Sequence, residues 1–158
     1  MGILFFMSAC TNNTVEVNGE KVDTSKMIHE HCTRAGSAGS GIDVNLSYEI
    51  YYTGEILNII ESTERVETTQ ANTLDLYENA YKSIHKNYEG LDYYDAEVER
   101  TNNSVTSHIT INYDKIDIGK LISIEGEDDN VFENKIPKVE KWKELAKKVG
   151  TKCSKVEE

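Results

Sequence analysis

The chain has little proline, few cysteines and a shortage of basic side chains. Its 158 residues include one proline, three cysteines and 17 lysines and arginines against 28 aspartates and glutamates, a formal charge of -11. This acidic balance argues against nucleic-acid binding, because a basic face is needed to neutralise phosphate. No apolar run approaches the ~20 residues that a membrane-spanning helix requires. The length fits one globular domain.

The first ten residues are mostly apolar and end in small residues followed by a cysteine. The pattern Met7-Ser8-Ala9-Cys10 resembles a bacterial lipobox, in which the cysteine thiol receives a diacylglyceryl group and becomes the new N-terminus. The apolar part is shorter than a secretory h-region and no Lys or Arg precedes it, so we expect residues 1–10 to be a truncated lipoprotein signal remnant. A frayed apolar N-terminus is the alternative. The lipobox predicts a protein anchored by lipid to the extracytoplasmic face of the cell membrane, stably so with two acyl chains.

A polar segment follows the cysteine. Residues 11–26 contain three valines as their only apolar side chains. Such a segment buries too little to offset its ordering entropy, so we expect a flexible tether. The folded part is then expected to be a single domain over residues 27–158.

Alternation of apolar and polar residues predicts the first strands. It is cleanest from Ile42 to Tyr52, which indicates a strand with one buried face. Thr53-Gly54 supplies a turn into a second strand over 55–68. A further strand is expected over 27–35, followed by a glycine-serine loop over 36–41.

The second half of the chain contains two helical patterns. Apolar residues recur every three or four positions between a cap at Asn72 or Thr73 and a stop at Gly90, which predicts a helix. The expected later elements are strands over 91–101 and 105–114, a short helical turn over 116–124, a closing helix from Pro137 to Val149 and an extended tail over 151–156. This order, β-β-β-α-β-β-α-β, predicts an α+β fold with an antiparallel sheet of about five to six strands and two helices on one face.

The cysteines support the lipobox interpretation. Cys32 and Cys153 lie 121 positions apart, and they form an even pair once Cys10 is assigned to lipid. In an exported protein such a pair is most simply a disulfide. Two free buried thiols and a metal site are the alternatives.

Several stretches are similar to the YehR-like family of small bacterial lipoproteins. They are the strand Val44-Asn-Leu-Ser-Tyr-Glu-Ile-Tyr-Tyr52, the tyrosine-rich helix, the run Val105-Thr-Ser-His-Ile-Thr-Ile-Asn-Tyr-Asp-Lys-Ile-Asp117 and the end Val149-Gly-Thr-Lys-Cys153. The resemblance covers about residues 27–153. It implies an envelope lipoprotein with a compact α+β domain, without an assigned activity or catalytic residues.

Histidines give a weak candidate metal site. His29 and His31 are two positions apart, so they project from the same side of a strand and could share a metal ion such as zinc, with His108 as a third ligand. Two ligands do not make a site, and a solvated or half-buried edge strand is the favoured explanation of the pair. We therefore predict no metal and no cofactor.

Other polar groups fall short of a motif. The acidic stretch from Glu125 to Asn130 could attract calcium, yet it lacks the alternating ligand spacing of a calcium loop and is expected to be a solvated turn. Ser104, Ser107 and His108 have no Gly-x-Ser-x-Gly context, so we predict no catalytic residue.

Charge and aromatic residues indicate possible contact surfaces. The closing helix region carries lysines that form a solvated face or a contact with anionic lipid or wall polymer. These are Lys138, Lys141, Lys148 and Lys152. Adjacent tyrosines on a strand point to opposite faces, so one of each pair is expected to be exposed. The pairs are Tyr51 with Tyr52 and Tyr93 with Tyr94.

The sequence therefore predicts a cell-envelope lipoprotein whose domain binds an envelope protein or a small ligand without catalysis. A structural or accessory subunit of a membrane complex is the first alternative, and an envelope enzyme is the second.

Overall fold

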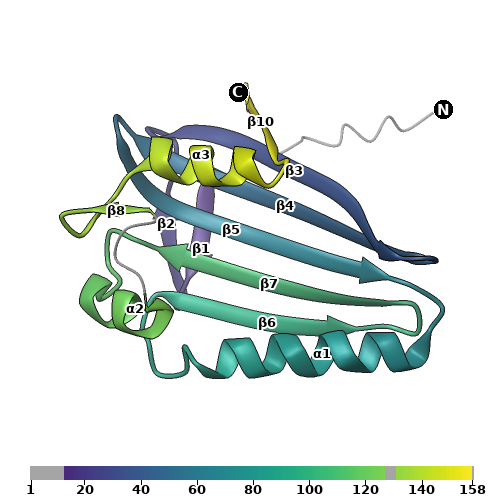
Figure 1. Ribbon diagram of the computed structural model, residues 1–158. Coiled ribbons are helices and arrows are strands. Elements are labelled where there is room, and N and C mark those ends of the chain that lie inside the picture. Colours follow the sequence, from purple (N-terminus) through teal and green to yellow (C-terminus); the bar gives the residue numbers. More distant parts are fainter. Residues whose placement is uncertain (1–12, 127–130, 158) are drawn as a thin grey trace, which may run out of the picture.

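The computed structural model describes residues 13–126 and 131–157. Six strands form one antiparallel sheet in the order β10-β3-β4-β5-β7-β6, and two short hairpins, β1-β2 and β8-β9, lie outside it (Figure 1). The elements are β1 (Thr14–Val17), β2 (Glu20–Asp23), β3 (Ile28–Gly39), β4 (Ile42–Thr53), β5 (Ile56–Glu67), α1 (Ala71–Lys86), β6 (Tyr94–Arg100), β7 (Ser104–Asn112), α2 (Ile118–Glu125), β8 (Phe132–Glu133), β9 (Ile136–Pro137), α3 (Val139–Lys148) and β10 (Lys152–Lys155).

All three helices pack on one face of the sheet, which we call the helix face. Because Ile60 and Val66 are an even number of positions apart on β5, both point to this face. Ile60 packs with Val139 of α3, and Val66 packs with Leu74 of α1. Leu121 of α2 is fully buried in a third cluster beside β7. The α+β prediction is confirmed, with a full helix α2 where a helical turn was expected.

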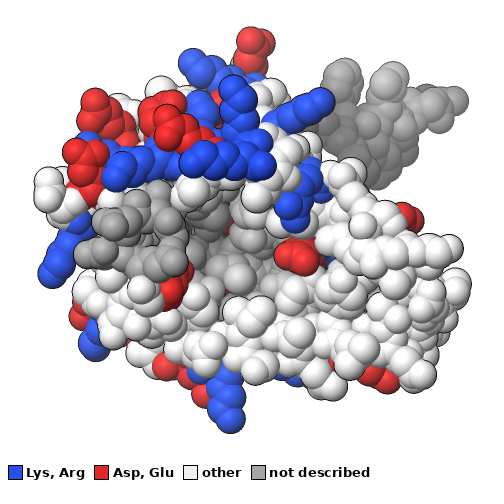
Figure 2. Space-filling model, viewed as in Figure 1, with Lys and Arg blue, Asp and Glu red and all other residues white. Residues whose placement is uncertain are grey.

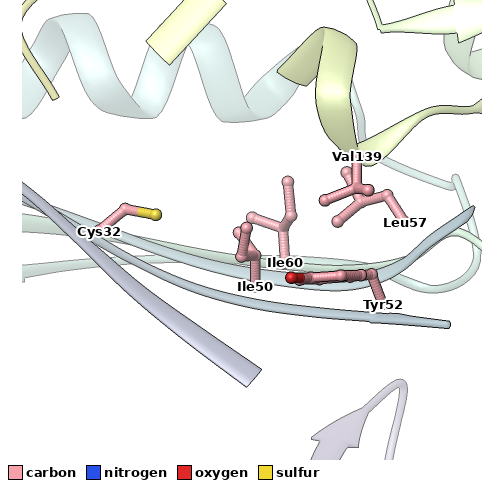
Figure 3. Packing of buried hydrophobic residues seen from close by; sticks show 6 residues of the cluster. All are labelled: Cys32, Ile50, Tyr52, Leu57, Ile60 and Val139. Carbon is pink, nitrogen blue, oxygen red and sulfur yellow. The ribbon is translucent and has the colours of Figure 1, made fainter. Parts of the chain in front are cut away.

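The core beneath α3 lies at the β3 side of the sheet. Ile50, Leu57 and Ile60 rise from the sheet toward Val139 of α3, as Figure 3 shows, and the buried Cys32 lies at the edge of the same cluster. Figure 1 places α3 over this edge and α1 along the opposite edge, at β6.

The hairpin β1-β2 packs on the other face of the sheet. Val15 and Val17 are buried there against Tyr51 and Ile59. The expectation of a flexible tether over 11–26 is therefore wrong for the part that the structure describes. Two valines on one side of a short strand bury enough apolar surface to dock it, although the segment as a whole is polar.

A tight turn and polar contacts hold this hairpin. Asn18 and Gly19 have φ values of 56° and 74°, the left-handed conformations that a two-residue hairpin turn requires. The backbone N–H of Asn18 donates to Asp95 Oδ2 at 2.7 Å, and Lys115 Nζ lies 2.6 Å from Glu20 Oε2. The hairpin is thus fixed to the sheet at its turn as well as through its valines.

Several element boundaries differ from the sequence expectations. A glycine-serine loop was expected over 36–41, but β3 continues as far as Gly39. Its residues stay paired with β4, with a register shift between Ser37 and Gly39. Pro137 lies in β9 rather than in a helix, and α3 begins at Val139. The sixth strand begins at Tyr94, and the expected C-terminal tail forms β10, paired with β3.

Candidate functional site

Two histidines and a glutamate form a cluster on the face opposite the helices, on the two strands next to the edge strand β10. His29 and His31 project from β3 to this face, as their spacing predicts, and Glu49 lies between them on β4. His29 Nε2 is 2.5 Å from Glu49 Oε2, and His31 Nδ1 is 2.5 Å from Glu49 Oε1. Each carboxylate oxygen therefore has an imidazole partner, and the cluster cross-links β3 to β4.

Glu61 and Tyr51 extend the cluster. Glu61 is half-buried on β5 directly opposite Glu49, and burial together with the Glu49 charge raises the pKa of Glu61, while His29 acts against the rise. The rings of His29 and Tyr51 stack with centroids 4.3 Å apart. Burial and the neighbouring carboxylates raise the pKa of Tyr51 to about 12, so its phenol stays protonated at neutral pH.

A cavity of about 440 Å³ opens beside the stacked rings of His29 and Tyr51. Segments far apart in the sequence build its wall: residue 13, the turn before β3, and the C-terminal residues after β10. Two backbone hydrogen bonds fix them, from Thr24 N–H to the Asn13 carbonyl at 2.8 Å and from Val156 N–H to the His29 carbonyl at 2.9 Å. Exposed or half-exposed parts of the wall include Lys26, Met27, Ile28, Lys155 and Val156.

The three-histidine candidate metal site is not assembled. His108 lies on the same face, but β4 and β5 separate its strand from β3. Three strand spacings amount to about 14 Å, too far for a shared ion. His108 instead lies 3.2 Å from Thr63 Oγ1 and 3.5 Å from Glu99 Oε2. In residues 13–126 and 131–157, no group of three or more His, Cys, Asp or Glu has a geometry suited to a metal ion.

The serines that we considered as nucleophiles have other partners. Ser107 Oγ lies 2.9 Å from His85 Nε2 on the helix face, whereas the adjacent His108 points to the opposite face. Ser104 Oγ lies 2.7 Å from Thr101 Oγ1. Most of the acidic stretch that we weighed as a calcium loop, residues 127–130, lies outside the described residues.

A disulfide closes the edge of the sheet. Cys32 of β3 and Cys153 of β10 are directly opposite each other, with an S–S distance of 2.07 Å. This is the pairing that the cysteine count predicts. The two cysteines are therefore neither free thiols nor metal ligands. The disulfide ties the last strand of the chain to the first strand of the main sheet.

The predicted lysine face is divided between half-buried side chains with partners and exposed side chains. Lys138 Nζ lies 2.9 Å from Glu55 Oε2, and Lys141 Nζ donates to the Phe132 carbonyl at 3.4 Å. Lys148 and Lys152 are exposed. Figure 2 shows lysines and acidic residues interspersed over α3.

The expectation that one tyrosine of each pair is exposed is wrong for both pairs. Tyr51 and Tyr52 do point to opposite faces, but they are only 8% and 6% exposed, because the β1-β2 hairpin covers one face and α3 the other. Tyr93 and Tyr94 are both half-buried.

Replacing Glu61 by glutamine is expected to stabilise the protein at pH 7 by about 0.2–1 kcal/mol, the magnitude of a cross-strand pair, because like charges directly opposite each other are destabilising. The raised pKa of Glu61 means that the folded state binds its proton more tightly than the unfolded chain does. The destabilising contribution of Glu61 to the free energy of unfolding is therefore absent below the pKa of Glu61 in the unfolded chain. It grows as the pH rises from that value through the raised pKa in the folded state. Urea titrations of Glu61→Gln at pH 7 and pH 4, with the exposed Glu89→Gln as control, measure this. An equal gain in stability at both pH values would contradict a destabilising charge on Glu61.

Comparison with known proteins finds a solved structure with a similar fold. The NMR structure of the E. coli YehR protein matches with a TM-score of 0.51 at 16% sequence identity, over 84% of this chain and 93% of that one. The chain has a YehR-like fold. An NMR structure of a protein from Streptococcus pneumoniae TIGR4 has a TM-score of 0.48 at 11% identity, over 80% of this chain and 85% of that one. No protein-family model and no curated protein matches the chain.

In the part of the chain that the structure describes, no helix is both long enough and apolar enough to cross a membrane.

Proposed function

We propose that this protein is a cell-envelope lipoprotein, attached through Cys10 to the outer face of the membrane, with a non-catalytic binding domain. The observation that carries the proposal is the Cys32–Cys153 disulfide. Structural disulfides form and persist in oxidising compartments outside the cytosol. With these two cysteines joined, Cys10 is the remaining one of three, and it ends the lipobox-like pattern.

Replacing Cys10 tests the anchor directly. In the native cell, Cys10→Ser is expected to move the protein from the membrane fraction to the soluble fraction, because acylation requires the thiol. The matched control is Thr11→Ser, which places the same residue one position further on, keeps the thiol of Cys10 and is expected to stay in the membrane fraction. Retention of Cys10→Ser in the membrane would overturn the proposed anchor.

The cavity beside the His29–Tyr51 stack supports the binding role. Its volume lies within the range of small-molecule sites, and it combines an aromatic wall with convergent polar groups. The separation of Ser107 and His108 onto opposite faces supports a role without catalysis.

Native mass spectrometry of the protein extracted from its membrane tests the cavity. We expect the wild type to carry a non-covalent mass that Met27→Trp lacks, because a larger side chain at this position fills the cavity. Leu76→Trp, at an exposed position on α1, is the control and is expected to keep the mass. A wild type without added mass, or equal masses in all three proteins, contradicts a ligand in this cavity.

One observation favours a second function, that of an accessory subunit of a membrane complex. Leu76, Ala80 and Ile84 are all exposed at four-residue spacing on α1, so they form an apolar stripe on the outer side of the helix, with Leu76 71% and Ile84 50% exposed. A photo-crosslinker at position 80 that captures one membrane protein in cells would favour this function, whereas capture of none would remove its support.

A further inference from the structure

The short distance between Cys10 and the folded domain restricts how an anchored molecule can lie. Cys10 precedes Asn13, the first described residue, by three positions, and three extended residues span about 10 Å at most. Asn13 is itself fixed, because its carbonyl accepts a hydrogen bond from Thr24 and the next residues form the docked hairpin β1-β2. A lipid on Cys10 therefore brings the surface around Asn13 close to the headgroups.

The side chains around Asn13 have the character of a membrane-contact surface. In the cavity wall that includes Asn13, apolar side chains are exposed, Ile28 by 42% and Val156 by 41%, and Met27 is half-buried. Two exposed lysines and one exposed glutamate, Glu157, adjoin them, so the charged side chains here are net positive. We call Lys26, Met27, Ile28, Lys155 and Val156 the anchor patch.

These side chains match the chemistry of a bilayer surface. Apolar side chains gain free energy by entering the boundary between headgroups and acyl chains. Lysines beside them bury their stems along apolar surface while the ammonium groups reach lipid phosphates. The distribution of charge along the chain is consistent with contact to anionic lipid. Residues 135–158 carry eight lysines against four glutamates in an otherwise acidic protein.

We infer that the anchor patch rests on the bilayer to which Cys10 is attached, with Ile28 and Val156 at the headgroup–acyl boundary and the two lysines directed to phosphates. This inference rests on the proposed lipid attachment at Cys10. It orients the whole domain: the cavity opens toward the membrane, and α1 lies at the far edge of the sheet, across five strand spacings or about 24 Å.

Tryptophan quenching by brominated phospholipid measures this orientation. The full chain, with its disulfide intact, is coupled through Cys10 to a maleimide lipid in vesicles of phosphatidylcholine and phosphatidylglycerol. In a Trp142→Phe background, which removes the one native tryptophan, the reporters are Ile28→Trp and, as matched control, the exposed Leu76→Trp. Val156→Trp replaces the first reporter if Ile28→Trp does not fold.

Brominated lipid is expected to reduce the emission of the patch reporter to roughly half and to leave that of the α1 reporter unchanged, because only the patch reaches the acyl boundary. Lys26→Glu with Lys155→Glu is expected to weaken the quenching on these anionic vesicles. An unquenched patch reporter, or equal quenching of both reporters, overturns the inference, and unchanged quenching after charge reversal overturns the role of the lysines.

A failure of this inference can be distinguished from a failure of the proposed function. Chemical coupling supplies the lipid, so the quenching result does not depend on whether the cell acylates Cys10. An unacylated Cys10 in the native protein contradicts the lipoprotein proposal and with it the native anchor on which the orientation rests, whereas an unquenched patch reporter contradicts the orientation alone.

Discussion

Removal of the Cys32–Cys153 disulfide is expected to lower the free energy of unfolding by about 4–5 kcal/mol. The bridge closes a loop of 121 positions, so its loss frees most of the described chain in the unfolded state. It also removes the covalent link between β3 and the edge strand β10, which then depends on its pairing with β3. Since small domains are stable by about 5–15 kcal/mol, this loss is a large fraction of the total stability.

Urea titrations of the wild type and of Cys32→Ser with Cys153→Ser measure this effect. Cys10→Ser controls for the loss of a thiol alone and is expected to match the wild type. Reductant should lower the stability of the wild type and leave the double variant unchanged. A double variant within 1 kcal/mol of the wild type, a small fraction of the expected loss, would contradict a stabilising role for the bridge.

Replacing Lys143 by methionine is expected to cost about 3 kcal/mol, because it leaves the buried Glu30 carboxylate without its cation. Glu30 is only 5% exposed, and its Oε2 accepts from Lys143 Nζ at 3.0 Å and from the Tyr52 hydroxyl at 2.7 Å. Burial and this hydrogen bond raise the pKa of Tyr52 to about 12, so the hydroxyl remains a donor. A phenol alone cannot compensate a buried negative charge.

The double variant separates a lost ion pair from lost packing. Adding Glu30→Gln to Lys143→Met removes the uncompensated charge and should recover more than half of the lost stability. Lys147→Met, at an exposed position on the same helix, is expected to change the stability by less than about 0.5 kcal/mol. No recovery in the double variant would show that the methionine disturbs α3 itself.

Regular periodicity made part of this fold predictable. The alternation from Ile42 to Tyr52 predicts β4 to within one residue, because one face of that strand is buried under helices. The three-to-four spacing around Leu74 and Tyr81 predicts α1 for the same reason. Pro137 was a misleading helix signal, since proline also fits the short strand β9 just before the helix.

The hairpin β1-β2 shows how average composition can hide a local signal. The segment is polar overall, which indicates a tether, but Val15 and Val17 alternate with polar residues directly before Asn18-Gly19. An Asn-Gly pair after such alternation is a strong short-range hairpin signal. Giving it more weight than composition would have predicted the hairpin, although not the face on which it docks.

The candidate site depends on contacts between strands that cannot be predicted from a single sequence. The two-residue spacing of His29 and His31 predicts their common face, but the placement of Glu49 between them depends on the pairing register of β3 and β4. The register shift near Tyr52 on the next strand pair cannot be read from residue types. The cavity is less predictable still, because its wall joins both ends of the described chain.

Intact mass spectrometry of the protein purified from its native membrane, before and after reduction and alkylation, tests the lipoprotein account most directly. The account predicts a chain that begins at an acylated Cys10 and takes up two alkyl groups only after reduction, one each at Cys32 and Cys153. A chain that retains unmodified Met1 and three cysteines open to alkylation without reduction would contradict the anchor, the oxidising compartment and the proposed function together.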